Sequence, residues 1–268
     1  SNQQFQDKRK IVKDEFQKEL SESESFEMTA KMQGRLDEIS KMLKGTDPQD
    51  IWNMDETALF WKLASSRTYK MDGKEGKNSK WSKDQLTIIV TVSVDGDTFD
   101  PQVLGKSACP RVLKGIEIDK TYGVVHDHSR KGWQNQHIFT HYIKNFNRFA
   151  ERKRKHYYLL VDNASSHVKG AKTLDPDGSQ DTKFEYKSVA IIFLPPNCTN
   201  TVQPCDVGII RSFKCHYRKA ALSSLFKALE RHIQQGKSGK FLLRDTLDMK
   251  LAMEFVQNSA KLDRNMIR

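Results

Sequence analysis

Three aspartates, Asp55, Asp162 and Asp206, stand where an apolar strand pattern stops or a helix pattern starts. Carboxylates are hard oxygen ligands of the kind that Mg²⁺ prefers. Two such ions about 3.5–4 Å apart can hold the attacking and leaving oxygens of a phosphodiester. The aspartates are far apart in sequence, but neighbouring strands lie only about 5 Å apart. If their strands are neighbours, the sequence predicts a metal site suited to phosphodiester hydrolysis.

Each aspartate also has an ordinary structural explanation. Asp206 follows Pro204 and opens a helix pattern, as an N-cap residue does. Asp162 could cap the short turn at 163–167, and Asp55 could be a turn residue. The pattern alone does not show that the three carboxylates meet, so both interpretations stay open.

The second aspartate ends the stretch YYLLVD, residues 157–162. This short apolar run, followed by small polar residues, is typical of a strand buried on both faces. Open α/β sheets place ligands and chemistry at the carboxyl ends of such strands. One further strand is predicted to end near Asp55 and another to begin near Ala58. Three more are predicted at 86–94, which an Asp-Gly turn follows, at 101–106 and at 188–194.

Apolar residues at helical spacing predict helices at 28–43, 134–154, 206–234 and 241–260. Strands first and strand–helix alternation later predict an α/β fold with a mixed sheet. We expect an N-terminal helical linker over 1–47, a main domain over 48–235 and a C-terminal helical extension over 236–268 that the end of the chain truncates.

The composition favours a polyanionic partner. The chain of 268 residues carries 45 Lys and Arg against 34 Asp and Glu, a net charge of +11, and its pI is about 9.4. Such a balance suits nucleic acid better than an acidic partner, although a solvated basic surface without a partner is the alternative.

The four cysteines form neither a CxxC pair nor a dense disulfide pattern, which favours a reduced, intracellular protein. No apolar run approaches a membrane span, so we expect a soluble protein with no membrane partner. The sequence begins Ser-Asn without methionine, and we expect a further domain upstream.

Four stretches resemble, in this order, the DDE endonuclease domain of pogo and Tigger transposases. They are IWNMDET, LTIIVTVSVDGD followed by VLGKSACPR, YYLLVDNASSH, and FLPPNCTNTVQPCDVGIIRSFK. That family includes the domesticated centromere protein B and jerky-like proteins, and it belongs to the wider Tc1/mariner group. The resemblance covers about residues 48–235 and implies an RNase H-like mixed sheet flanked by helices.

Carried over residue by residue, the resemblance gives Asp55, Asp162 and Asp206 as the three catalytic and metal-binding acids. The interval between the last two is longer than usual in the family, and the surplus lies in the polar segment 170–188, which reads as a surface insertion. Glu56 stays a reserve candidate, because successive strand residues point to opposite faces.

The resemblance implies a transposase or integrase-type DNA endonuclease with two Mg²⁺ or Mn²⁺ ions. It would hydrolyse a phosphodiester at a transposon end, and the freed 3′-hydroxyl would then attack target DNA. In such phosphoryl transfers, positioning and charge stabilisation replace a covalent protein nucleophile. The implied partner is double-stranded DNA, a homo-oligomer stays open, and the implied location is the nucleus.

Two basic segments are candidates for DNA phosphate contact. Arg211, Lys214 and Arg218 share one face of the helix that follows Asp206. A second set lies in a predicted basic hairpin and consists of Lys74, Lys77, Lys80 and Lys83. A solvated lysine-rich loop is the alternative for the second set, and the RKRK run at 152–155 could be a nuclear localisation patch.

The histidines do not form a zinc pattern. His126 with His128, and His137 with His141, lack a supporting third ligand at a suitable spacing. His167 follows Asp162 in the family motif, where hydrogen bonding at the strand end explains it as well as catalysis does. The tryptophans at 52, 61, 81 and 133 are expected in the core rather than as base-stacking platforms.

Two classes of function therefore remain. One is an active transposase core, and the other is a domesticated DNA-binding regulator that keeps the fold without cutting. A nuclease acting on RNA–DNA hybrids shares the fold, but these motifs give it no support.

Overall fold

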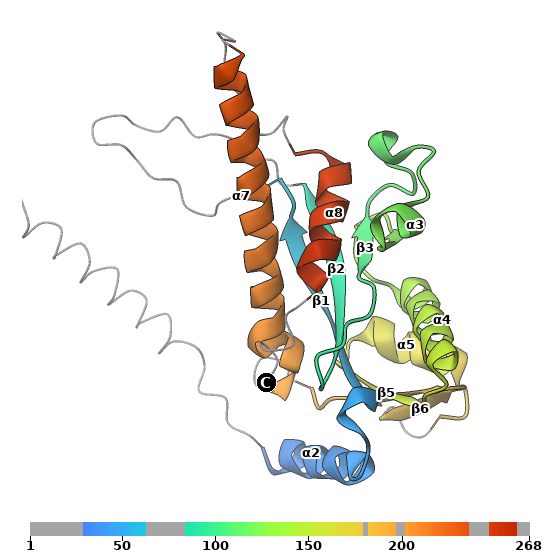
Figure 1. Ribbon diagram of the computed structural model, residues 1–268. Coiled ribbons are helices and arrows are strands. Elements are labelled where there is room, and N and C mark those ends of the chain that lie inside the picture. The colour runs from blue at the N-terminus through green and yellow to red at the C-terminus, as the bar shows by residue number, and fades with distance from the viewer. Residues whose placement is uncertain (1–28, 63–83, 179–181, 197–201, 236–246, 262–268) are drawn as a thin grey trace, which may run out of the picture.

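One seven-stranded mixed sheet forms the centre of the fold, as the computed structural model of the chain shows (Figure 1). The structure describes residues 29–62, 84–178, 182–196, 202–235 and 247–261. The strands lie in the order β4-β3-β2-β1-β5-β7-β6. Their bounds are β1 (Ile51–Phe60), β2 (Gln85–Ser93), β3 (Gln102–Gly105), β4 (Val125–His128), β5 (Tyr157–Val161), β6 (Lys183–Tyr186) and β7 (Val189–Phe193).

Strand β2 runs antiparallel to both of its neighbours, and β6 runs antiparallel to β7. The other adjacent pairs are parallel. The five central strands, β3-β2-β1-β5-β7, thus have the order and directions of an RNase H-like sheet. The fold class expected from the sequence is confirmed.

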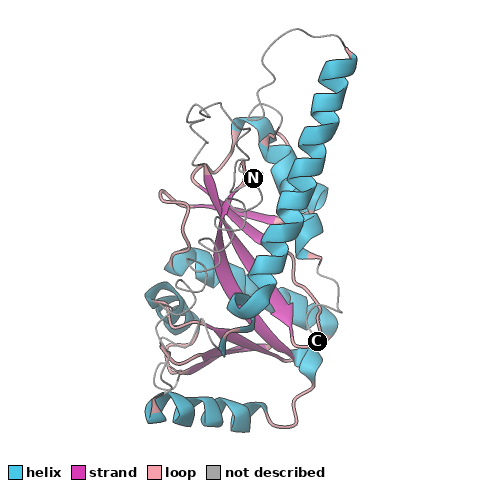
Figure 2. Ribbon diagram, turned by 90° about the vertical axis from the view of Figure 1, so that its left-hand side faces the viewer, coloured by secondary structure: helices cyan, strands magenta, loops and turns pink. Residues whose placement is uncertain are grey.

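Helices cover both faces of this sheet (Figures 1 and 2). On one face α4 (Gln136–Lys153) and α5 (Ser165–Leu174) enclose an apolar core. On the other face α7 (Ile210–Gln234) and α8 (Met249–Ala260) share a second core. The 3₁₀ turns η1 (Pro48–Asp50) and η2 (Arg111–Leu113) and the short helix α3 (Ile118–Tyr122) complete the connections.

The strand β1 serves both cores because its side chains alternate between the two faces. Trp52 packs on the α4 side, where its ring centroid lies 5.5 Å from that of Phe146 and 5.2 Å from that of Tyr157. Leu59 packs on the α7 side. Residues 53, 55 and 57 therefore face α7, whereas Glu56 faces α4 and α5.

The helix α2 (Ala30–Leu43) lies across one end of the sheet (Figure 1). Ile39 packs on Ile192 and Leu194, and the Arg35 guanidinium donates to the Thr182 carbonyl at 2.9 Å. This helix and the long helices α4 and α7 confirm the predictions from apolar spacing. The helix predicted at 241–260 is present as α8, and its first residues, like the predicted basic hairpin, lie outside the described residues.

The predicted break between two strands at Asp55 is wrong. Strand β1 is continuous from Ile51 to Phe60, and nine of its residues pair in register with β2. The ladder of backbone hydrogen bonds to β2 overrides the poor strand preference of Asp55 and Glu56. Asp55 consequently lies in the middle of a strand, not at its end.

The interpretation of 170–188 as a surface insertion is also wrong in part. Residues 170–174 complete α5, and Lys183–Tyr186 form the edge strand β6 against β7. Phe184 is buried on Phe193, with ring centroids 5.8 Å apart. One apolar side chain and an edge pairing were too weak a pattern to predict a strand.

The tryptophans divide between core and surface. Trp52 and Trp61 are buried, as predicted, and Trp81 lies outside the described residues. Trp133 is 60% exposed, so the prediction of a core position is wrong for it. It sits in the turn between β4 and α4, whose hydrogen bonds hold its ring away from the core.

Among the described helices, none is long and apolar enough to cross a membrane.

Candidate active site

The first aspartate meets the third on the α7 face of the sheet. The Asp55 carboxyl makes a hydrogen bond with the Asp206 carboxyl. Its Oδ1 also accepts from the Glu56 N–H at 2.7 Å. Burial, then the charge and hydrogen bond of Asp206, raise the pKa of Asp55 to about 8, and the charge of Asp162 adds to the shift. Both other predicted acids therefore lie within electrostatic range of Asp55.

The third aspartate is carried by a π turn, η3 (Cys205–Ile209), that leads into α7. Such wide turns are rare in helices and often occur at functional sites. The predicted helix from about Asp206 is thus present, with a different first turn. Asp206 is exposed and its side chain makes no N-cap hydrogen bond, so the N-cap explanation does not hold.

Asn53 fixes this turn to the sheet. Its Nδ2 donates to the Leu160 carbonyl on β5 at 3.1 Å, and its Oδ1 accepts from the Cys205 N–H at 2.9 Å. The side chain is 3% exposed, and the Cys205 thiol lies 3.8 Å from the Asn53 carbonyl. One amide therefore joins the strands of the first two acids to the turn of the third.

The second aspartate directly follows β5, as predicted, and is held by His167 from α5. His167 Nδ1 lies 2.5 Å from Asp162 Oδ1. On the other side of the ring, Nε2 lies 2.6 Å from Gln134 Oε1 and 3.1 Å from Glu56 Oε1. With acceptors at both nitrogens, the imidazole is best satisfied when both carry a proton.

The charges of this cluster are consistent with an imidazolium. Burial alone would lower the pKa of His167, but the hydrogen bonds and charges of Asp162 and Glu56 raise it to about 9. Burial likewise opposes ionisation of Asp162, yet the hydrogen bond and charge of His167 hold the pKa of Asp162 below its usual value. Asp162 therefore stays a carboxylate while Asp55 holds a proton.

Glu56 contacts His167 on the face of β1 opposite to Asp55. This position agrees with the prediction that successive strand residues place Glu56 and Asp55 on opposite faces. The hydrogen bond of His167 at the strand end agrees with the structural explanation that the sequence offered for it. The parts of Glu56 and Gln134 in this cluster were not predicted. Gln134 lies just before α4 and had no recognisable pattern.

One basic side chain of α7 lies next to the acids. Lys214 is partly buried and interacts electrostatically with Asp206, Asp55 and Arg218. Burial and the Arg218 charge lower the pKa of Lys214, against the pull of the two aspartates. Arg218 is partly exposed and Arg211 is fully on the surface. The lysines at 74, 77, 80 and 83 lie outside the described residues.

The sequence profile of the DDE superfamily endonucleases matches residues 83–264. This chain belongs to that family. Asp162 and Asp206 lie within the matched residues, whereas Asp55 precedes them.

Curated relatives agree with the family. The mouse Tigger transposable element-derived protein 4 is 24% identical over 202 residues, which cover 75% of this chain and 36% of that protein. The human major centromere autoantigen B is 25% identical over 204 residues, which cover 75% and 30%. The human Jerky protein homolog is 26% identical over 181 residues, which cover 63% and 29%. The chain spans about a third of the length of these relatives.

Among solved structures, the Mos1 mariner paired-end complex with Mn is similar, with a TM-score of 0.45 and 13% identity over 88% of this chain and 60% of that one. The Mos1 catalytic domain has a TM-score of 0.41, also at 13% identity, over 88% and 89%.

The donor set of this DDE family member suits a divalent cation only in part. Burial and the Asp206 charge raise the pKa of Asp55, and a cation held between the two carboxyls would relieve their repulsion. In the described part of the chain, however, no group of three or more His, Cys, Asp or Glu is close enough to hold a metal ion. Asp162 is engaged by His167 and does not join the other two in one ligand set.

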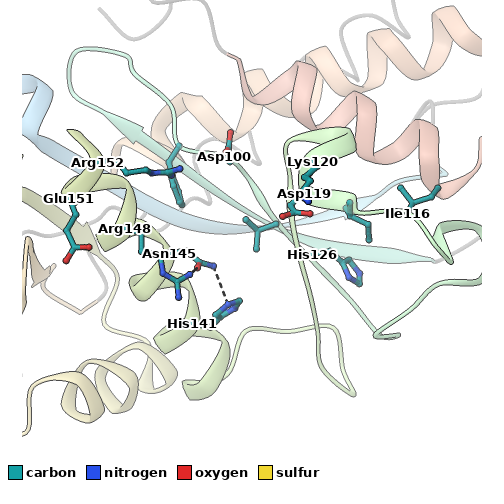
Figure 3. Close-up of a pocket in the computed structure, with 13 residues that line it drawn as sticks. Asp100, Ile116, Asp119, Lys120, His126, His141, Asn145, Arg148, Glu151 and Arg152 are labelled. Atoms are coloured by element: carbon teal, nitrogen blue, oxygen red, sulfur yellow. Dashed lines mark hydrogen bonds between the residues drawn. The ribbon is translucent and has the colours of Figure 1, made fainter. Parts of the chain in front are cut away.

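A wide hollow of about 1040 Å³ lies elsewhere, between α4 and the α3–β4 connection (Figure 3). Arg148, His141 and Asn145 line it from α4, with Lys120 and His126 opposite. None of the three acids contributes to it. His141 pairs with Asp127 at 2.8 Å, and the hollow holds charges of both signs without a family motif.

We predict that Asn53→Ala destabilises the protein strongly. It leaves the buried Cys205 N–H and Leu160 carbonyl without partners, at about 1–3 kcal/mol each. The free energy of unfolding, from urea titration, should fall by about 2–5 kcal/mol. Asn145→Ala on the surface of α4 is the matched control and should change it by less than about 1 kcal/mol. A loss no larger than the control's would contradict the role given to Asn53.

We also predict that Asp55→Asn stabilises the metal-free protein, and more so at higher pH. The raised pKa of Asp55 means that the folded protein keeps a proton that the unfolded chain releases above about pH 4, so stability falls as pH rises towards 8. Asparagine removes this loss and can still donate to Asp206. In EDTA, the gain over the parent should grow by at least about 1 kcal/mol between pH 5 and pH 8.5. The surface variant Asp177→Asn should show no such trend; a flat difference for Asp55→Asn would refute the raised pKa.

Proposed function

We propose that the chain is the catalytic core of a transposase-type DNA endonuclease, which hydrolyses phosphodiesters at DNA ends and transfers the freed strand to target DNA. The observation that carries the proposal is the Asp55–Asp206 carboxyl pair with Asp162 in electrostatic range, in a member of the DDE family. Three acids are rarely held close together for structural reasons alone, because the repulsion between their carboxylates destabilises the folded protein.

Asp55, Asp206 and Asp162 would hold the cations, Mg²⁺ or Mn²⁺. A divalent cation held there supplies positive charge against the phosphoryl oxygens and makes water a stronger nucleophile. The Asp162 carboxylate interacts with His167 and the Ala164 backbone in this structure, so it would have to reorient to join the other two acids around a cation. His167 keeps Asp162 ionised and oriented, since its own ring is fixed by Gln134 and Glu56. Lys214 and Arg218 are placed to attract the DNA backbone towards the acids.

A domesticated regulator is the second candidate. The relatives include proteins named major centromere autoantigen B and ARS-binding protein 1 as well as a transposable element-derived protein. Such a protein would bind double-stranded DNA without cutting it. Under either function we propose a nuclear location, a catalytic domain over 48–235 between a helical linker and a helical extension, and homo-oligomerisation as a property to be measured.

We expect Asp162→Asn to fold and bind DNA but not to cut it. Asparagine can still accept from His167 Nδ1, yet it lacks the charge that a divalent cation requires. The assay uses the full-length protein, a labelled duplex with its cognate ends, and Mn²⁺ or Mg²⁺. Asp177→Asn should cut like the parent. Equal rates for the parent and Asp162→Asn would eliminate a catalytic role for Asp162.

Thermal unfolding provides a second measurement on the same proteins. Mn²⁺ at 100 times its dissociation constant should stabilise the parent by about 2.7 kcal/mol, and Asp55→Asn or Asp206→Asn should lose this effect. A parent that takes up no cation and cuts no cognate end supports the regulator instead.

We expect Arg211, Lys214 and Arg218 to set part of the salt dependence of DNA binding. Alanine at all three should weaken binding and reduce the slope of log K against log salt by up to about one unit per lost phosphate contact. A matched triple variant at Lys219, Lys227 and Arg231, farther along α7, should keep more of the slope. If both triple variants lose the same slope, the face near the acids has no special role.

A further inference from the structure

Trp133 is an exposed tryptophan beside the candidate site. It lies in the turn 129–135 between β4 and α4, and its side chain is 60% exposed. The Lys131 ammonium lies over the ring, 5.6 Å from its centroid. An exposed ring of this size offers a planar aromatic face that a flat partner could cover.

The turn that carries Trp133 is held firmly. The Trp133 N–H donates to Ser129 Oγ at 2.9 Å, and Ser129 Oγ donates to the Trp133 carbonyl at 2.7 Å. Thr87 on β2 donates to the Gly132 carbonyl at 2.7 Å. Gly132 has a φ of +70°, a conformation that suits glycine. The ring is therefore presented by a fixed backbone instead of a loose loop.

The turn is joined to the second acid through its neighbour Gln134. Gln134 is 8% exposed and lies 2.6 Å from His167 Nε2, and His167 in turn contacts Asp162. Gln134 and Glu56 both reach His167 on the α4 and α5 side of the sheet. A nucleotide whose phosphate reached Asp162 from that side would lie towards the Trp133 turn.

The surroundings of the ring are basic. Arg130 and Lys131 in the turn are exposed, and Lys106 lies against Gly132 from the end of β3. The Asp127 carboxylate at the end of β4 is hydrogen-bonded by Gln102 at 2.6 Å and by His141 at 2.8 Å, so its charge is partly satisfied within the protein. An aromatic face among cations matches the pattern of sites that stack bases while holding their phosphates.

We propose that Trp133 stacks on an unpaired nucleobase of the DNA strand bound at the acid site, with Lys106, Arg130 and Lys131 on its phosphates. An internal base of a duplex cannot take this position, because both of its faces are covered by neighbouring bases. The substrate class proposed is DNA with a frayed or single-stranded end, and the blunt duplex tests whether a paired terminal base suffices. The inference rests on the proposed function for its ligand, DNA, but not for cleavage.

The test measures equilibrium binding of the full-length protein in EDTA at fixed salt. Three probes share one duplex: a blunt end, a short single-stranded overhang, and the same overhang with abasic sites. Trp133→Ala should weaken binding to the overhang about tenfold, while Trp133→Phe keeps most of the affinity. The loss should vanish on the abasic overhang and the blunt duplex, because the phosphates are unchanged and only the base is missing.

Phe226→Ala, at an aromatic residue on α7 that is 61% exposed, is the matched control and should bind all three probes like the parent. The thermal midpoints of all variants should agree within a few degrees, which separates binding from folding. Intrinsic fluorescence gives a second readout, since the overhang should quench the parent more than Trp133→Phe.

An equal loss on the abasic and intact overhangs would overturn the stacking role, as would unchanged affinity in Trp133→Ala or a parent that does not bind the overhang. If Trp133→Ala keeps its affinity for the overhang, a protein partner would remain as the group that contacts this ring. Cleavage is scored separately with Mn²⁺. If the parent cuts and Trp133→Ala binds normally, the stacking proposal fails but the endonuclease proposal stands. If Trp133→Ala loses binding tenfold and the parent never cuts, the endonuclease proposal fails but the stacking proposal stands.

Discussion

The contact between the Asp55 and Asp206 carboxyls is the constraint on which the rest of the site depends. Two acids in contact, with a third nearby, repel one another, and the fold must supply the free energy that holds them together. It does so through apolar packing on both sides of the sheet and through the buried amide of Asn53. Burial and this repulsion together raise the pKa of Asp55.

The pKa values of Asp55 and Asp162 are shifted in opposite directions. On the α7 face, Asp55 sits among like charges and is driven towards its protonated form. At the end of β5, Asp162 lies against a buried imidazolium and is kept ionised. Environments that push the pKa values of neighbouring carboxyls apart are a common feature of active sites. The opposite shifts of Asp55 and Asp162 show the same pattern.

Local sequence determined the elements with strong periodicity. The apolar run before Asp162 is short and uninterrupted, and the spacing along α4 and α7 is helical, because burial on one or both faces imposes those periods on the sequence. The family motifs predicted the three acids by residue. What the sequence did not determine was the continuity of β1 through Asp55, the edge strand β6, and the exposure of Trp133. Those depend on hydrogen bonds to distant segments: β1 on its ladder with β2, β6 on β7, and the Trp133 turn on Thr87. Likewise only tertiary structure joined Asn53 to Cys205, and His167 to Glu56 and Gln134, since a side-chain contact between residues more than 30 positions apart leaves no periodic trace in the chain.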